Sequence, residues 1–412
     1  MNNNAQTLKG FRDFLPRDCR VRNYVKNILT ETFLSFGFQP LETPALEYKS
    51  TLVGKSGSET EKLLYTFTDK GERQIGLRYD LTVPAAKVLA IYQNEITLPF
   101  KRFQIQPVWR ADKPQKGRFR EFVQSDIDIY GSSSPLAEAE IVAIIYQSLT
   151  KLNFKNFQIK LNSRIVLSQI IAQSGIETDK NTVLQSLDKL SKIGNNGVKD
   201  ELVSKGLSST QIDSLFDYIK TAQPDDYLKQ VLDTIATLGV PQDFYSFSPT
   251  LVRGLDYYTG PIFETFIEDS NIGAVGGGGR YDNLIKNLGG PDVPAVGYAF
   301  GFERLIEVIN DLDLLPKLSQ SPTKIMIANF DSETLPQSLK LASLLRQNNI
   351  NTLFYPNTDK IGKQFKYADS QKIPFVAIIG SDEIKENLIT LKNMQTREQK
   401  SITQAELLQI LC

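Results

Sequence analysis

Residues 100–130 read FKRFQIQPVWRADKPQKGRFREFVQSDIDIY, and they predict two β-strands, 100–109 and 122–130, on either side of a turn at 112–117. The strands are rich in aromatic and β-branched residues, and Pro114 and Gly117 favour the turn. Against one acid, Asp112, the segment 100–120 carries the basic residues Lys101, Arg102, Arg110, Lys113, Lys116, Arg118 and Arg120. Arginines on both arms of a hairpin suit a polyphosphate, because each guanidinium can bond two oxygens at once. A solvated basic hairpin is the alternative.

The second strand of this hairpin alternates polar and apolar residues. Alternation puts Gln124, Asp126 and Asp128 on one face of the strand. An amide and two carboxylates beside Arg110 are unusual for a hydrophobic core. We therefore expect this face to form the floor of a pocket.

The chain before and after the hairpin predicts an antiparallel sheet with flanking helices. Apolar residues at helical spacing predict a helix over 20–36, and Ser134-Pro135 begins a second helix over 135–153. Further strands are expected at 63–67 and 74–78.

A helical subdomain is expected to interrupt this sheet at 165–240, where the period is helical and aromatic residues are few. Strand-like segments resume at 244–268 and 273–282, and an apolar helix is expected near 295–310. A linker rich in Pro, Ser and Lys follows around 315–322.

The last part of the chain predicts a small α/β domain. Its expected strands are 324–330, 351–356 and 374–380, and its expected helices are 333–347 and 360–372. The predicted boundaries are 1–164 for the first part of the main domain, 165–240 for the insertion, 241–316 for the second part, and 322–412 for the C-terminal domain.

The composition excludes several classes of protein. The chain has 412 residues, 47 basic and 47 acidic, so no overall charge draws it to nucleic acid or membrane. Two cysteines, Cys19 and Cys412, cannot form a disulfide framework, and no apolar run approaches a membrane span. Secreted and membrane proteins are therefore excluded, and a reducing, cytoplasmic compartment is expected.

Histidine is absent from the sequence. Its absence removes the commonest general base, the commonest metal ligand and every nucleophile that a histidine activates. Reactions that depend on positioning and charge neutralisation, such as nucleotidyl transfer, remain compatible with the composition.

Three further segments could carry chemistry. Residues 251–260, LVRGLDYYTG, hold polar side chains that need partners or a ligand if buried, and an internal Arg253–Asp256 pair is the alternative. Residues 276–282, GGGGRYD, let the backbone approach a ligand, although a glycine run is more often a mobile loop. Residues 301–305, GFERL, put Arg304 in an apolar helix, where a surface arginine is the ordinary interpretation.

Together these segments resemble the class II aminoacyl-tRNA synthetases, and the histidyl-tRNA synthetase family in particular. In chain order they are 37–47 (motif 1), 77–84 (LRYDLTVP, the substrate loop), Arg110 to Arg120 (motif 2), 251–260 and 278–282 (the two histidine-specific motifs) and 301–305 (motif 3). The resemblance runs from about Gly10 to the C-terminus. It implies an α+β fold with an antiparallel six-stranded sheet, flanking helices, a helical insertion and a C-terminal α/β anticodon-binding domain.

The resemblance also implies the reaction. L-Histidine would react with ATP and Mg²⁺ to give histidyl-adenylate, which is then transferred to tRNA-His. The protein would be a cytoplasmic homodimer without a membrane contact, and no metal site made by protein side chains alone is expected.

Site residues are carried over on the matching positions. Arg253 and Arg110 would be catalytic. Histidine would bind to Asp80, Thr82, Arg110, Gln124, Asp128, Arg253, Tyr257 and Tyr258. ATP would bind to Arg110, Arg118, Arg120, Arg304, Gly278 and Gly279, and Gln115 would touch the tRNA acceptor end. Asp128 would accept from the imidazole N–H while Tyr257 or Tyr258 donates to its other nitrogen.

Two alternatives stay open. Some synthetase-like proteins are catalytically inactive regulatory subunits in histidine biosynthesis, although such proteins tend to lose residues that correspond to Arg110, Arg253 or Arg304, or the C-terminal domain. A synthetase for another amino acid would not need the pairing of Asp128 with two tyrosines.

Overall fold

A computed structural model of the chain describes residues 5–53, 58–114, 117–177, 180–253, 257–315 and 321–411. The internal contacts divide the chain into two compact units, Met1–Leu315 and Pro316–Cys412. Within the described residues, no helix is both long and apolar enough to cross a membrane.

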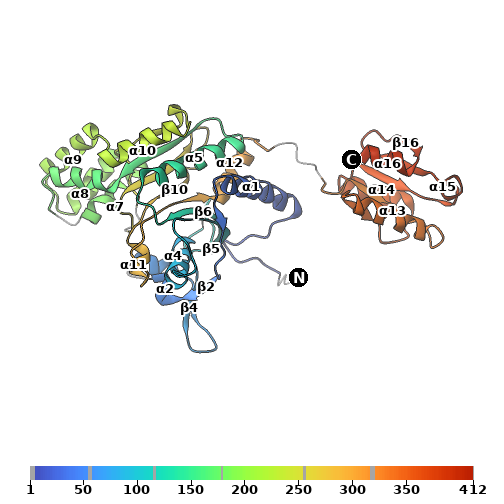
Figure 1. The fold of residues 1–412 in the computed structure, drawn as a ribbon, viewed down its shortest axis with the longest axis horizontal. Coiled ribbons are helices and arrows are strands. Elements are labelled where there is room, and N and C mark those ends of the chain that lie inside the picture. The colour runs from blue at the N-terminus through green and yellow to red at the C-terminus, as the bar shows by residue number, and fades with distance from the viewer. Residues whose placement is uncertain are drawn as a thin grey trace. The chain divides into compact units, whose positions relative to one another are not determined.

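The first unit is built on an eight-stranded sheet with the order β1-β5-β6-β11-β10-β9-β7-β8 (Figure 1). The strands are β1 (Gln39–Pro40), β5 (Phe100–Trp109), β6 (Glu121–Tyr130), β7 (Phe157–Ser163), β8 (Tyr245–Phe247), β9 (Pro261–Ile267), β10 (Ala274–Arg280) and β11 (Ala295–Gly301). The six inner strands are β5, β6, β11, β10, β9 and β7. Each pairs antiparallel with its neighbours, which confirms the predicted six-stranded sheet. The short edge strands β1 and β8 add parallel pairs that the sequence did not predict.

The hairpin β5–β6 has one polar face. Directly opposite pairs along it are Arg102 with Asp128, Gln104 with Asp126, and Gln106 with Gln124. Five of these side chains are buried, all but that of Gln106. Because each polar group lies across from another, the burial of this face is partly offset by pairing, although Arg102 Nε and Asp126 Oδ2 have no hydrogen-bond partner.

Four helices, labelled in Figure 1, share one apolar core with the sheet. They are α1 (Pro16–Ser35), α5 (Pro135–Lys151), α10 (Asp226–Thr237) and α12 (Phe302–Asp311). As the sequence predicts, Ser134 begins α5, and its hydroxyl accepts from the N–H of Leu136 at 3.3 Å.

Between β7 and β8 the chain forms α6 (Arg164–Gln173), α7 (Lys180–Leu187), α8 (Leu190–Ser204) and α9 (Ser209–Thr221), then α10 and the short turn η1 (Gln242–Phe244). Helices α6 to α9 pack in a second core that also includes residues of β6 and β9, whereas α10 packs in the core of the main sheet. A capping box at Ser208 and Gln211 fixes the start of α9.

Two predictions about the first unit were wrong. Residues 295–310 are not one helix, because 295–301 form strand β11 and only α12 is helical. Strand β11 pairs with β6 and β10 and is mostly buried, so its continuous apolar run cannot be distinguished from a buried helix by pattern alone.

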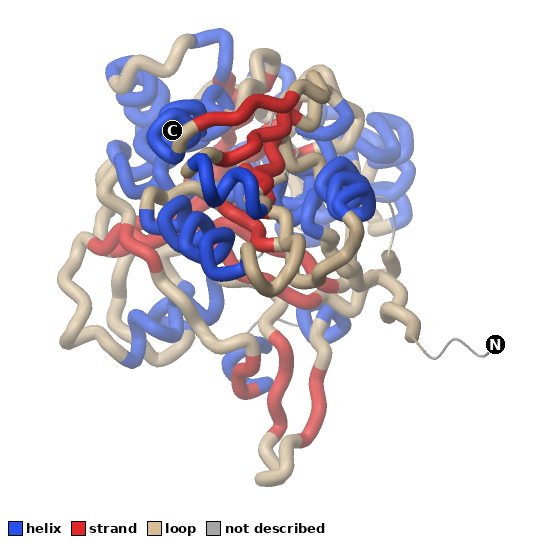
Figure 2. Tube along the Cα trace, turned by 90° about the vertical axis from the view of Figure 1, so that its right-hand side faces the viewer, coloured by secondary structure: helices blue, strands red, loops and turns tan. Residues whose placement is uncertain are grey.

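The second wrong prediction concerns the segments near 63–67 and 74–78, which do not join the main sheet. They belong to a separate three-stranded sheet, β2-β4-β3, whose hairpin extends from the unit (Figure 2). Its strands are β2 (Leu46–Tyr48), β3 (Thr66–Thr68) and β4 (Gln74–Leu77), and the neighbouring short helices are α2 (Lys49–Val53), α3 (Ser58–Leu63), α4 (Thr82–Ile91) and α11 (Leu284–Asn287).

The C-terminal unit is a five-stranded sheet with the order β13-β12-β14-β15-β16. Its strands are β12 (Ile325–Ile327), β13 (Thr352–Phe354), β14 (Phe375–Ile378), β15 (Ile389–Asn393) and β16 (Gln399–Ile402), and its helices are α13 (Leu335–Gln347), α14 (Ile361–Ser370), α15 (Ser381–Glu386) and α16 (Gln404–Leu411). The first three strands are parallel and alternate with helices as predicted. The antiparallel pair β15–β16 was not predicted, because its polar residues resemble a loop.

We predict that Gly278→Ala strongly destabilises the first unit. A Cβ at this position of β10 would clash with the carbonyl oxygen of Gly297 and lie 2.7 Å from the Cα of Tyr298, and neither backbone atom can move alone. We expect a loss of about 3 kcal/mol or more in the free energy of unfolding. Urea unfolding followed by the fluorescence of Trp109, the chain's one tryptophan, measures it. The control Gly71→Ala meets only side-chain atoms, at 3.3–3.4 Å, and should change the free energy by less than about 0.5 kcal/mol.

Candidate active site

A cavity of about 870 Å³ lies in the first unit, between the β5–β6 turn, strands β9, β10 and β11, the start of α12 and the α7–α8 corner of the insertion. Its basic lining residues are Arg110, Lys113, Arg118, Lys160, Lys192, Arg253 and Arg304. Its acidic lining residues are Asp112, Asp188, Glu264 and Glu303. The excess of basic groups favours an anionic ligand.

Arg110 lies at the end of β5 and is held in place by its neighbours. Its Nε donates to the backbone oxygen of Tyr79 at 3.0 Å, and its Nη2 donates to Gln124 Oε1 at 3.3 Å. Gln124 in turn donates to Asp126 Oδ1 at 3.3 Å. The guanidinium also lies 5.1 Å from the ring centroid of Phe122, which lines the cavity and offers it an aromatic face.

Arg253 lies against β10 because that strand has no side chain to exclude it. A Cβ at Gly277 would clash with Arg253 Nη1. The same Nη1 is 3.5 Å from Glu264 Oε1 on β9, and both residues line the cavity. Sequence analysis missed Glu264, because one acid in an apolar strand gives no local signal.

Arg304 and Arg118 face the same part of the cavity. Burial and, after it, the charge of Arg118 lower the pKa of Arg304. Arg304 Nη1 donates to the backbone oxygen of Ala274, and among the described residues neither arginine forms an ion pair with a carboxylate. Two cations without acidic partners favour a bound polyanion.

Glu303, next to Arg304, ties the N-terminal segment to the site. Arg12 Nη2 lies 2.6 Å and Arg22 Nη1 2.7 Å from Glu303 Oε2, and the N–H of Val123 donates to Oε1 at 3.2 Å. These contacts join α1, β6 and α12. The sequence did not predict them, because 281 residues or more separate each arginine from Glu303.

A second group of predicted residues gathers beside Arg110. Asp80 precedes α4, where its Oδ1 accepts from the N–H of Val83 at 3.2 Å. Burial raises the pKa of Asp80 to about 6, although Val83 and Arg110 act against it. Burial, then Tyr258 and Asp80, hold the pKa of Tyr257 well above its usual value, so its hydroxyl stays a donor.

Asp128 already has protein partners in this structure. Its Oδ2 lies 2.5 Å from Arg102 Nη2, and its Oδ1 accepts from the hydroxyl of Tyr281. The ring of Tyr281 is 5.8 Å from that of Tyr257, which in turn is 4.7 Å from Tyr258. Asp128 is therefore part of a buried wall next to the tyrosines rather than of the cavity lining among the described residues.

The structure brings together some of the predicted site residues and not others. The cavity lining includes Arg110, Arg118, Gln124, Arg253 and Arg304. Of the described residues, those outside that lining are Asp80, Thr82, Arg120, Asp128, Tyr257, Tyr258, Gly278 and Gly279. Gln115 lies outside the described residues.

Arg120 and the later glycines have structural partners. Arg120 donates to the backbone oxygens of Asp112 at 3.1 Å and of Lys9 at 3.3 Å, which ties the turn to the N-terminal segment. At Gly278 and Gly279 a Cβ would meet the backbone of neighbouring strands, whereas Gly276 and Gly277 line the cavity.

The described residues contain no group of three or more acidic or cysteine side chains that could hold a metal ion by themselves. The carboxylate of Glu264 faces the cavity, so it is available to a metal ion that enters with a ligand.

Comparison with known proteins identifies relatives over nearly the whole chain. Residues 10–305 match the family model of histidyl-tRNA synthetase, and residues 324–411 match that of the anticodon binding domain. A histidine–tRNA ligase of Cytophaga hutchinsonii is 40% identical, over 96% of each chain.

Solved structures are also similar. The crystal structure of histidyl-tRNA synthetase from a Nostoc species is 31% identical with a TM-score of 0.85, over 99% of each chain. An ATP phosphoribosyltransferase regulatory subunit/histidyl-tRNA synthetase from Bacillus halodurans has a TM-score of 0.75 at 20% identity, over 91% of this chain and 99% of its own, which is a likeness of fold alone.

We predict that the first unit becomes less stable as the pH rises through neutrality. Burial raises the pKa of Asp126 to about 8, despite the charge of Arg102. The folded state therefore holds a proton that the unfolded state releases above about pH 4, and the free energy of unfolding falls until about pH 8. For one proton, the free energy of unfolding falls by about 1.4 kcal/mol for each pH unit in this range.

The Asp126→Asn variant should lose most of this slope, because the amide stays neutral in both states. Urea unfolding at several pH values between about 6.5 and 8, where Asp80 with its pKa of about 6 is mostly ionised, measures the slope by Trp109 fluorescence. The exposed Asp217→Asn variant is the control and should keep the slope of the unmodified protein. An Asp126→Asn protein with that same slope would contradict the assignment.

Proposed function

The chain belongs to the histidyl-tRNA synthetase family, and we propose that its cavity is where L-histidine is activated with ATP and then joined to tRNA-His. The enzyme is a histidine–tRNA ligase. The observation that carries the assignment of the site is the convergence of Arg110, Arg118, Arg253 and Arg304 on one cavity, beside a buried cluster of carboxylates and tyrosines. A regulatory subunit without catalysis would have no need of this set.

ATP would lie with its phosphates among the arginines. Arg118 and Arg304, which form no ion pair with a described carboxylate, suit the distal phosphates, while Arg110 and Arg253 suit the α-phosphate. Phe122 gives a face on which the adenine can stack. Mg²⁺ would arrive with ATP, and Glu264 is the cavity carboxylate best suited to contact it.

Histidine would bind beside Arg110, where the α-amino group meets carboxylate and amide oxygens. Asp80, Thr82 and Gln124 are the proposed ligands of that group, and Tyr257 or Tyr258 would donate to one imidazole nitrogen. Asp128 would accept from the other, provided that it gives up the bond from Tyr281. A ligand without a donor could not replace the bond from Tyr281 to Asp128, and a ligand without an acceptor would leave the tyrosine hydroxyl without a partner.

The reaction has two displacements. An oxygen of the histidine carboxylate attacks the α-phosphorus, an O–P bond forms, and the bond to the β-phosphate breaks to release pyrophosphate. A hydroxyl of the terminal tRNA ribose then attacks the carbonyl carbon, and AMP leaves. Arg253 would stabilise the charge on the α-phosphate in the first step. Because the chain has no histidine, no imidazole of the protein takes the hydroxyl proton in the second.

The C-terminal unit would bind the anticodon, because residues 324–411 match the anticodon-binding model. Gln115, in the β5–β6 turn, remains our candidate for contact with the acceptor end. A chain that acts on tRNA in this way would work in the cytoplasm.

We predict that the protein catalyses ATP–pyrophosphate exchange with L-histidine and with none of the other nineteen amino acids. Arg253→Ala should reduce the exchange rate by about 10²- to 10³-fold, because it removes a cation from the charge that develops on phosphate. Arg73→Ala, an exposed arginine on the β3–β4 hairpin paired with Asp69 at 2.7 Å, is the matched control and should be fully active. A folded protein without exchange would contradict the proposal.

We also propose that the protein is a homodimer through its small sheet and the neighbouring edge strand β1. Leu46, Tyr48 and Phe67 are 44%, 54% and 46% exposed on that sheet. Three large apolar side chains on one small sheet favour a covered face.

Light scattering after size exclusion should therefore give the mass of two chains. The double variant Tyr48→Glu/Phe67→Glu should give one chain, because two carboxylates cannot be buried unpaired. Val203→Glu, on helix α8 and 55% exposed in the unmodified protein, should remain a dimer. A dimer that survives the double variant would exclude this face.

A further inference from the structure

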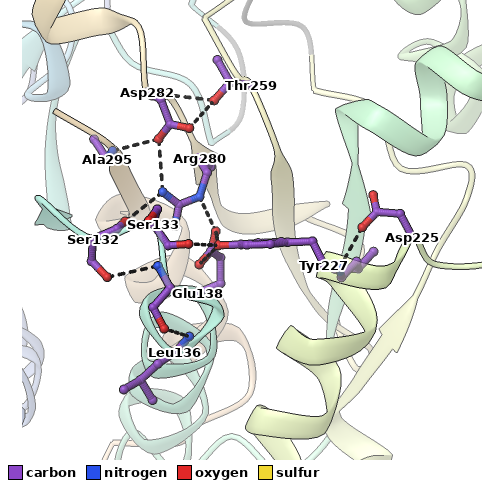
Figure 3. Close-up of polar contacts among 12 residues, drawn as sticks. Ser132, Ser133, Leu136, Glu138, Asp225, Tyr227, Thr259, Arg280, Asp282 and Ala295 are labelled. Atoms are coloured by element: carbon purple, nitrogen blue, oxygen red, sulfur yellow. Dashed lines mark hydrogen bonds and ion pairs between the residues drawn. The ribbon is translucent and has the colours of Figure 1, made fainter. Parts of the chain in front are cut away.

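A buried network of charged groups lies outside the cavity, where α5, α10 and the end of β10 meet (Figure 3). Glu138 of α5 is 0% exposed and Arg280 of β10 is 5% exposed. Arg280 Nε donates to Glu138 Oε1 at 2.5 Å. A buried ion pair is stable only when the other atoms of both groups also find partners, so the geometry of these groups depends on their neighbours.

Helix α10 supplies one of those neighbours. Tyr227, in the first turn of α10, has its hydroxyl 3.1 Å from both oxygens of Glu138 and 3.1 Å from the backbone oxygen of Ser133. Burial and, after it, the charge of Glu138 raise the pKa of Tyr227, so the hydroxyl keeps its proton. Helix α10 therefore contributes a hydrogen-bond donor to a buried carboxylate of α5.

Arg280 extends the network in the opposite direction. Its Nη1 donates to the backbone oxygen of Ser132 at 2.9 Å and to Asp282 Oδ1 at 3.1 Å. The Thr259 hydroxyl donates to Asp282 Oδ2 at 3.3 Å, and the N–H of Thr259 donates to the backbone oxygen of Arg280 at 2.8 Å. Thr259 is thus hydrogen-bonded to both Arg280 and Asp282.

These contacts surround the tyrosines of the histidine pocket. Thr259 directly follows Tyr257 and Tyr258, and Tyr281 lies between Arg280 and Asp282. The ring of Tyr281 is 5.8 Å from that of Tyr257, and its hydroxyl donates to Asp128. A shift of the Arg280 side chain would therefore move both sides of the tyrosine wall.

We propose that Tyr227, Glu138 and Arg280 position the histidine pocket, and that helix α10 acts on amino-acid affinity through the hydroxyl of Tyr227. All three are positioning residues, since their contacts reach the pocket only through Thr259, Tyr281 and Asp282. The inference rests on the proposed function, because it concerns the same histidine site.

The test is Tyr227→Phe, which removes one hydroxyl and keeps the ring that packs on the core. We expect the dissociation constant of L-histidine, measured by calorimetry, and its KM in pyrophosphate exchange to rise about fivefold. The KM of ATP should change by less than about twofold, because the network does not touch the arginines of the cavity. The matched control is Tyr355→Phe in the C-terminal unit, which removes a hydroxyl that donates to Asp359 at 2.8 Å. It should leave all three constants unchanged.

The outcomes separate positioning from a purely structural role. Lower thermal stability with an unchanged histidine constant, or an equal rise in both KM values, would overturn the inference. In a double variant with Glu138→Gln, the effect of Tyr227→Phe should fall below about twofold, because the coupling passes through that carboxylate. An undiminished effect in that background would also overturn it. A protein that binds histidine without pyrophosphate exchange would refute the proposed function, while the Tyr227 comparison of binding constants would still decide the inference.

Discussion

The close approach of strands β9, β10 and β11 is the constraint on which the site depends. Strand β10 carries four consecutive glycines, and a Cβ on any of them would collide with a neighbour. One face of the run takes the guanidinium of Arg253, and the backbone of Gly278 meets that of Gly297. Gly297 in turn leaves room for the carboxylate of Asp128. The missing side chains thus admit a cation near the cavity and an anion in the wall beside it.

Buried charge is the second constraint on the structure, and each buried arginine of the main sheet forms an ion pair with a carboxylate. Arg102 and Asp128 lie opposite each other on β5 and β6, so a fully buried arginine has a partner at 2.5 Å. Of the arginines that line the cavity, Arg253 lies 3.5 Å from Glu264, whereas Arg118 and Arg304 have no ion pair with a carboxylate among the described residues. The same residue type therefore serves the core as half of a close ion pair, and the ligand site with its charge paired loosely or not at all.

The sequence predicted the long hairpin well, because β5 and β6 have strong aromatic and β-branched signals and a turn with Pro114 and Gly117. It also predicted the alternation of Gln124, Asp126 and Asp128. The sequence could not predict that Arg102 is buried while Arg110 lines the cavity. Arg102 lies opposite Asp128 inside the sheet, whereas Arg110 lies just beyond the end of β5, and this difference appears only in the fold. The Arg12–Glu303 pair was missed because 291 residues separate its members, and Glu264 was missed because a single acid in an apolar strand gives no local signal.

The wall beside the cavity is made of phenols, carboxylates, amides and guanidinium groups, in a chain without a single histidine. In a complex of the untagged protein with its amino acid, every imidazole nucleus then belongs to the ligand. No imidazole resonance in the nitrogen magnetic resonance spectrum of such a complex can come from the protein. The resonances of the two ring nitrogens would then report the tautomer and the protonation state of the bound imidazole as residues around it are substituted.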